Sequence, residues 1–115
     1  LAGHSLGGAM AAVYADKNSE KLDGLIFLAA YSTKDLSDTD LKVLSIYGSN
    51  DGVVNMDKVT EERKLMPSVY EEFCIQGGNH AGYGDYGAQK GDGEADISAK
   101  EQQEETAEKI VEFCE

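Results

Sequence analysis

A continuous run of six apolar residues, from Leu25 to Ala30, is the feature that most constrains how this chain can fold. The run has no polar residue that could face water, so both faces of a strand formed by it must be covered. Parallel sheets bury their strands in this way, because helices cover them on both sides. The run therefore predicts an inner strand of a mostly parallel α/β sheet.

Two further strands are predicted downstream of this run. The segments 41–48 and 68–77 both carry strand-like apolar patterns. The adjacent Glu71 and Glu72 indicate that the second of these strands is less completely covered than the inner one. Strands that alternate with helices are typical of parallel sheets with right-handed crossovers. Because 115 residues suffice for one core and not for two, we expect a single domain over residues 1–115.

Helices are predicted between and after these strands. Small residues at helical spacing dominate the segment 6–17, and Asn55 and Pro67 mark the start and the end of a second helix. A third helix begins after Ser98, whose spacing from Glu101 matches a capping box. Its apolar face is predicted from four residues at positions i, i+3, i+4 and i+7, namely Ala107, Ile110, Val111 and Cys114.

Two connections differ in length and composition. About eleven residues separate Ala30 from the strand that starts near Leu41, which leaves no room for a helical cap. The seventeen residues from Gly77 to Gly93 include seven glycines, so no regular element is expected there. Any cover over a site must therefore come from this glycine loop or from upstream sequence.

The chain is strongly acidic, with 22 Asp and Glu against 10 Lys and Arg and a net charge of -12. Such a charge repels phosphate backbones and anionic membrane surfaces, so neither nucleic acid nor a membrane is an expected partner. No apolar run approaches the length of a membrane span. A small uncharged molecule remains compatible with this composition.

Cys74 and Cys114 both lie in apolar patterns, without a Cys/His cluster around them. We expect buried, reduced thiols and no metal site. A disulfide between the last strand and the last helix stays open at this point.

Ser5 is the centre of a Gly-x-Ser-x-Gly pentapeptide that runs from Gly3 to Gly7. A nucleophile elbow holds a serine in strained φ/ψ at a sharp strand-to-helix turn, and its flanking residues are small so that the two backbones do not collide. A strand end precedes the motif, and a helix of small residues follows it. The N–H of Leu6, at the start of that helix, would point at a developing oxyanion.

A serine hydroxyl becomes a nucleophile when a base takes its proton, and the chain has two histidines. His4 adjoins Ser5, and neighbours in an elbow point in different directions, so we expect His4 to pack beside the strand end as a pocket residue. His80 follows the strand 68–77 at its carboxyl end, where α/β proteins place their sites. His80 is the predicted base, and a solvent-exposed loop histidine is the alternative.

Asp51 is the predicted partner of His80. It follows the strand 41–48, where its carboxylate could fix the tautomer of the imidazole and stabilise its charged form. The alternative is a turn aspartate that bonds only to the backbone. Asp57 and Asp85 are weaker candidates, because neither lies at a strand end.

The segments GHSLGG, GSNDGVV and GGNHAGYGDYG resemble the nucleophile, acid and histidine segments of the α/β-hydrolase family. The order Ser5, Asp51, His80 is that family's chain order. The compact spacing, 46 and then 29 residues, looks like the dienelactone-hydrolase-like esterase branch. The resemblance implies the C-terminal half of an α/β-hydrolase fold. Because the dienelactone enzymes themselves usually carry a cysteine nucleophile, Ser5 favours a general ester as substrate.

This resemblance implies a serine hydrolase that cleaves a carboxylic ester through an acyl-enzyme, without a metal or an organic cofactor. A thioesterase, a peptidase and a non-catalytic binding member of the fold are the alternatives. In the family, the N-terminal half supplies the first strands and a second oxyanion N–H, so we expect the segment 1–115 to be inactive alone. Its open sheet edge should make it self-associate or leave it partly disordered before residue 20.

Tyr83 and Tyr86 in the glycine loop are candidates for the mouth of the pocket. Equally, they could be aromatic anchors that tie the loop down. The chain does not start with a secretion signal, and upstream sequence could carry one, so its compartment is left open, with the cytoplasm as the default expectation.

Overall fold

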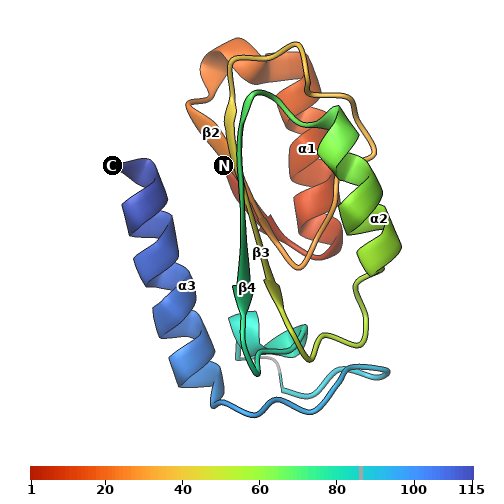
Figure 1. Ribbon diagram of the computed structural model, residues 1–115, viewed down its shortest axis with the longest axis vertical. Helices are drawn as coiled ribbons and strands as arrows, with labels where there is room; N and C mark the ends of the chain where they lie inside the picture. Colours follow the sequence, from red (N-terminus) through yellow and green to blue (C-terminus); the bar gives the residue numbers. More distant parts are fainter. Residues whose placement is uncertain (86) are drawn as a thin grey trace.

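The computed structural model describes residues 1–85 and 87–115, and its centre is a four-stranded sheet (Figure 1). All neighbouring strands are parallel, and their order in the sheet is their order in the chain. The strands are β1 (Ala2–His4), β2 (Gly24–Leu28), β3 (Lys42–Gly48) and β4 (Val69–Ile75). The predicted parallel sheet is confirmed. β1 lies at one edge, and the expected self-association through this edge stays a prediction.

Helices cover both faces of the sheet. The helices α1 (Leu6–Asn18) and α2 (Met56–Glu61) lie on one face, and α3 (Ala99–Cys114) lies on the other (Figure 1). Short 3-10 turns follow α1 and α2 at Ser19–Lys21 and Glu62–Leu65. Within the described residues, no helix is long and apolar enough to cross a membrane.

The inner strand β2 divides the core between the two faces. Leu25 and Phe27 pack with the α1 alanines Ala11, Ala12 and Ala15 in one buried cluster. Alternate residues of the same strand turn to the other face, where Ile26 joins Leu44, Ile46 and Ile75 against α3. This alternation explains why the strand residues of the run are apolar on both faces, because each face of the strand has its own core.

β2 ends at Leu28, two residues earlier than the end of the apolar run predicts. Ala29 adopts a φ of 51°, in the left-handed region that side chains rarely occupy, and this turns the chain out of the strand. Ala29 and Ala30 nevertheless stay buried. The apolar run therefore supplies both a strand and part of the loop that follows it.

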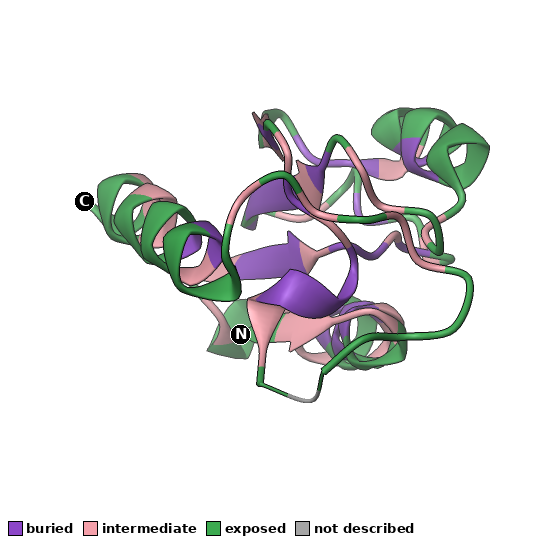
Figure 2. Cartoon of the chain, turned by 90° about the horizontal axis from the view of Figure 1, so that it is seen from below, coloured by how far each residue is buried: buried purple, intermediate pink, exposed green. Residues whose placement is uncertain are grey.

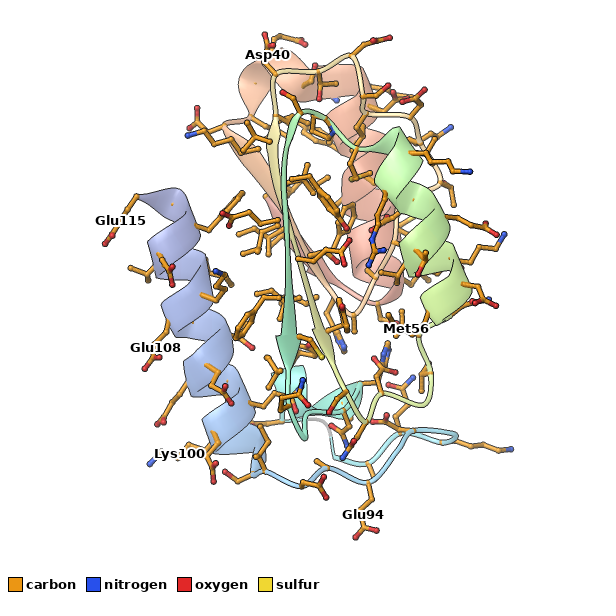
Figure 3. All side chains as sticks on the ribbon, in the orientation of Figure 1. Asp40, Met56, Glu94, Lys100, Glu108 and Glu115 are labelled. Carbon is orange, nitrogen blue, oxygen red and sulfur yellow. The ribbon has the colours of Figure 1, made fainter. Side chains whose placement is uncertain are left out.

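The predicted apolar face of α3 is wrong for three of its four residues. Ala107, Val111 and Cys114 are exposed, and only Ile110 packs partly against the sheet. The buried residues of this helix are instead the polar Gln102 and Thr106, and Phe113 packs partly on the core. The labelled Glu108 and Glu115 point away from the sheet (Figure 3). The first turns of α3 face the loop at Asn79. The side chain of Gln102 bonds both the N–H and the carbonyl of Asn79, so a polar residue is needed at this position.

Both cysteines are free. Cys74 is half-buried, whereas Cys114 is exposed at the C-terminal end of α3. The expectation of buried thiols is therefore wrong for Cys114.

The helix starts are confirmed. The side chain of Asn55 accepts hydrogen bonds from the N–H groups of Asp57 and Lys58 at 3.0 and 3.2 Å. The hydroxyl of Ser98 accepts the N–H of Glu101 at 3.1 Å. The glycine loop departs from expectation, because residues Ala81–Tyr83 form one 3-10 turn, η3, directly after His80.

Candidate active site

Ser5 lies at the sharp turn between β1 and α1. Its φ of 57° and ψ of -127° place it outside the regions that L-residues prefer, as the elbow prediction requires. Its N–H donates to the carbonyl of Leu28 at 3.0 Å, which ties the turn to the end of β2. The hydroxyl is thereby presented at the carboxyl end of the sheet.

Two glycines allow this turn to be so sharp. A Cβ on Gly3 would lie 2.4 Å from the carbonyl oxygen of Gly7, and a Cβ on Gly8 would lie 2.5 Å from the Cβ of Ala30. A Cβ on Gly7 would meet nothing within 4 Å. The expected need for a tiny residue on both sides of Ser5 therefore holds at Gly3 and is wrong at Gly7. The close approach on the helix side falls one residue later, where α1 packs on the loop after β2.

His80 bridges Ser5 and Asp51. Its Nε2 lies 2.9 Å from the Ser5 hydroxyl, and its Nδ1 lies 2.8 Å from Oδ2 of Asp51. The side chains of His80 and Asp51 are each only 1% exposed. The three residues follow β1, β3 and β4, whose carboxyl ends point toward the bottom of Figure 1. The structure thus brings together the three side chains that the sequence predicts as nucleophile, acid and base.

Asp51 also has the backbone role that was considered as its alternative. Its Oδ1 accepts the N–H groups of Val53 and Val54 at 2.7 and 2.8 Å, while Oδ2 faces His80. One oxygen therefore fixes the turn and the other fixes the imidazole. With Nδ1–H donating to Asp51, the neutral ring presents Nε2 as an acceptor to the Ser5 hydroxyl, an arrangement that permits proton transfer.

His4 and Tyr83 form an aromatic group beside His80. The His4 ring lies 4.9 Å from that of His80 and 5.3 Å from that of Tyr83, centroid to centroid. Nε2–H of His4 donates to the backbone carbonyl of His80 at 2.7 Å. Burial lowers the pKa of His4 and raises that of Tyr83. His4 therefore packs beside the strand end, and Tyr83 packs against the core and the His4 ring.

A cavity of about 390 Å³ adjoins Ser5 and His80. Its described walls are mostly apolar and carry no Lys, Arg, Asp or Glu, and they include Leu6, Ala9, Ala30, Tyr31, Val53 and Val54. Neither His4 nor Tyr83 is among the described residues that line it, and their role in a substrate pocket stays a prediction. Tyr86 lies outside the described residues. No sequence pattern pointed to the valines, because their approach to Ser5 depends on the turn that Asp51 forms.

Leu6 is the first residue of α1, and its side chain is 74% exposed at the rim of this cavity. An N–H at this position has no carbonyl of the same helix to bond. Its service as an oxyanion donor stays a prediction. The two weaker acid candidates lie elsewhere, with Asp57 in the first turn of α2 and Asp85 accepting the side chain of Gln103 at 3.3 Å.

The loop after β2 forms part of the cavity and is held by a buried carboxyl group. The N–H of Ser32 donates to Oε2 of Glu62, whereas Oε1 of Glu62 is buried without a hydrogen-bond partner among the described residues. Burial raises the pKa of Glu62 to about 7. Glu62 therefore holds a proton at higher pH than an exposed glutamate does.

Sequence reasoning missed the side chains that hold the His80 loop. Oε1 of Gln102 accepts the N–H of Asn79 at 3.0 Å, and its Nε2 donates to the carbonyl of Asn79 at 2.7 Å. Asp92 accepts four backbone N–H groups around the same loop. In the sequence, Asp92 is marked only by its position between Gly91 and Gly93, and this pattern is a weak indication of a role in the loop. Among the described residues, no group of three or more His, Cys, Asp or Glu could hold a metal ion.

Three solved structures of similar fold are described as hydrolases or as a lipase. A predicted CIB-like hydrolase from Thermoplasma acidophilum is 20% identical, with a TM-score of 0.66 over 95% of this chain and 48% of its own. A putative dienelactone hydrolase from Klebsiella pneumoniae is also 20% identical, with a TM-score of 0.71 over 97% and 49%. A monoacylglycerol lipase from Paleococcus ferrophilus is 14% identical, with a TM-score of 0.68 over 98% and 66%.

These likenesses concern the fold, and the chain spans about half to two thirds of the length of the structures that it matches. No curated protein sequence matches it. The model of the alpha/beta hydrolase family matches residues 1–104, which is most of the chain. Together with the parallel sheet and the strained serine turn, this match shows that the chain belongs to the alpha/beta hydrolase family.

Proposed function

We propose that the full-length protein is a serine hydrolase that cleaves a carboxylic ester through an acyl-enzyme intermediate. The observation that carries this proposal is the hydrogen-bonded series from the Ser5 hydroxyl through His80 to Asp51, with Ser5 in a strained turn. Strained, buried and mutually bonded groups of this kind are typical of catalytic centres. Within the family, they fit the roles of nucleophile, base and acid.

The proposed reaction has two halves. Oγ of Ser5 forms a bond to the ester carbonyl carbon while its proton passes to Nε2 of His80, and His80 then gives that proton to the leaving alkoxide. In the second half, His80 takes a proton from water, the water oxygen attacks the acyl carbon, and Ser5 recovers its proton as the acid departs. Asp51 stays ionised and stabilises the imidazolium. The N–H of Leu6 would donate to the oxyanion.

The cavity and the net charge support a small, uncharged substrate. The cavity walls are apolar next to Ser5, and the net charge of -12 opposes nucleic acid and anionic surfaces as partners. The proposed steps require no metal or organic cofactor. The same mechanism could cleave thioesters and amides. The proposed preference for esters is therefore tested by comparing all three.

The test uses the full-length protein, a fluorophosphonate probe and three matched substrates, namely an ester, a thioester and an amide with the same acyl group. We expect the probe to label Ser5, and the ester to be cleaved fastest. Ser5→Ala should abolish both labelling and hydrolysis. Ser37→Ala is the control, because Ser37 bonds only locally to Asp35 in the connection after β2.

Two results would contradict the proposal. A folded wild-type protein that the probe does not label would remove Ser5 as nucleophile. Hydrolysis that persists unchanged in Ser5→Ala would assign the activity to another group or favour a non-catalytic binding protein. A thioester or amide cleaved faster than the ester would keep the mechanism and change the substrate class.

A further inference from the structure

The carboxylate of Asp92 lies where the loops that carry His80 and Asp51 meet. Its Oδ1 accepts the N–H of His80 at 3.0 Å and the N–H of Gly52, the residue after Asp51, at 3.2 Å. Its Oδ2 accepts the N–H of Ala81 at 2.9 Å. Oδ1 also accepts the N–H of Gly93 at 2.8 Å. One side chain therefore bonds backbone groups from three separate segments of the site.

The environment of Asp92 favours its ionised form. Burial acts to raise its pKa, but the N–H groups of Ala81, His80, Gly52 and Gly93 together outweigh burial and lower it. Hydrogen bonds from N–H groups to a charged carboxylate are shorter and stronger than bonds between neutral groups. Asp92 is thus a charged acceptor that the proposed reaction itself does not use.

The neighbouring contacts indicate what Asp92 does. Gln102 holds the peptide groups of Asn79 on one side of His80, and Asp92 holds His80 and Ala81 on the other. The bond to Gly52 then links this loop to the turn that carries Asp51. The backbones of the acid and the base are therefore joined through a single carboxylate, a short distance from the reacting atoms.

We propose that Asp92 is a positioning residue that holds the imidazole of His80 between Asp51 and Ser5. The proposal rests on the proposed hydrolase function. Asp92 acts only through backbone groups, so its loss should displace the base without removing any reacting atom. A displacement of about 1 Å in a catalytic group can cost on the order of 100-fold in rate.

The experiment compares three variants of the full-length protein. Asp92→Ala should lower kcat for ester hydrolysis by about 100-fold and leave KM within about threefold, because the substrate cavity is not touched. Asp92→Asn keeps one acceptor oxygen but places an amide NH₂ where the second oxygen was, so we expect a loss of about tenfold. Asp85→Ala is the matched control from the same loop, since Asp85 contacts only Gln103 among the described side chains, and it should match the wild type.

Proton NMR gives a readout that does not depend on turnover. The hydrogen bond from Nδ1–H of His80 to Asp51 should give a far-downfield resonance in the wild type. This resonance should broaden or disappear in Asp92→Ala, while the thermal unfolding curve shows a folded protein. A stable fold that retains its other downfield signals would separate mispositioning of His80 from general destabilisation.

Wild-type kcat and an unchanged resonance in folded Asp92→Ala would overturn the inference. If Asp92→Ala does not fold, Asp92→Asn provides the test. A folded Asp92→Asn protein with the wild-type kcat would also overturn the inference. Failure of the wild-type protein to react with the fluorophosphonate probe counts against the proposed function instead. In that case the resonance still tests whether Asp92 positions His80.

Discussion

The turn that carries Ser5 and the loop that carries His80 lie next to each other, but different interactions hold them in place. Sterics hold the Ser5 turn, because β1 and α1 approach so closely that Gly3 has no room for a Cβ. Polar side chains from distant positions, chiefly Gln102 and Asp92, hold the His80 loop. The Ser5 turn therefore depends on a close backbone approach that only glycine permits at residue 3, whereas the His80 loop depends on hydrogen bonds from residues that are distant in the sequence.

This difference determines how each region can fail. A turn that depends on a close backbone contact tolerates most substitutions away from that contact. A substitution that adds volume at the contact is strongly destabilising. A loop held by hydrogen bonds fails in steps, because each lost acceptor leaves one or two backbone groups unsatisfied. Figure 2 looks onto this end of the molecule, where the buried η3 turn lies beside the sheet and α3 remains exposed on its outer side.

The sharpest test of the comparison is the same substitution at two glycines. Gly3→Val would force a branched side chain into the backbone of Gly7, and we expect a loss of more than about 4 kcal/mol in the free energy of unfolding. Gly7→Val should change it by less than about 1 kcal/mol, because a Cβ there meets nothing within 4 Å. Urea unfolding and probe labelling would measure both. Equal losses in the two variants would show that sterics do not hold this turn.

The corresponding test of the His80 loop is Gln102→Ala. Gln102 is fully buried and satisfies both the N–H and the carbonyl of Asn79, so its removal leaves two unsatisfied groups and a void. We expect a loss of about 3 to 4 kcal/mol in the free energy of unfolding, with slower hydrolysis in the protein that remains folded. Gln103→Ala, at the next position of α3, is the control. A Gln102→Ala protein as stable as this control would contradict the polar attachment of the loop.

The loop after β2 offers a third and smaller test, because a single titratable group holds it. The pKa of Glu62 is raised from 4.5 to about 7. The protonated form is favoured by folding, so its stabilisation is complete below pH 4.5 and is lost as the pH rises through 7. Glu62→Gln keeps an acceptor for Ser32 and cannot ionise. It should therefore add on the order of 2 kcal/mol at pH 8 and little at pH 4.5.

Thermal unfolding of the wild type and Glu62→Gln across this pH range would measure the effect. Glu61→Gln is the matched control, since Glu61 is exposed and its nearest cation is Lys58 at 3.8 Å. Parallel pH curves for the wild type and Glu62→Gln would show that Glu62 is not buried as described.

The parts of the site that depend on local rules were predictable from the sequence. The strained turn at Ser5 follows from a short glycine pattern, and Asp51 and His80 follow from their places at the ends of strands. Parallel pairing brings such ends to one edge of the sheet, so the three side chains could be expected to lie together. The inner strand was also predictable from a local rule. A strand that is apolar on both faces must be covered by helices on both sides, and this is typical of parallel α/β sheets.

The parts that depend on tertiary contacts were not predictable. Gln102 lies on the inward face of α3 because its side chain bonds both backbone groups of Asn79, whereas the Thr106 hydroxyl donates to the Gln102 carbonyl one turn earlier in the same helix. Apolar periodicity alone selected Val111 and Cys114 instead. Asp92 gave almost no signal, because three of its four partners, Gly52, His80 and Ala81, lie at positions that no spacing rule connects to it. Gly7 was misjudged, since only the path of α1 shows which glycine approaches the sheet.

The order of the strands has a consequence for a chain that is being synthesised. Ser5 is synthesised before His80, which follows β4 at the opposite edge of the described sheet from β1, 75 residues later. Gln102, which fixes the residue before His80, emerges later still. Ser5 and His80 therefore cannot meet until β4 has been made and has paired with β3, and a chain that ends before residue 80 carries Ser5 without this hydrogen bond.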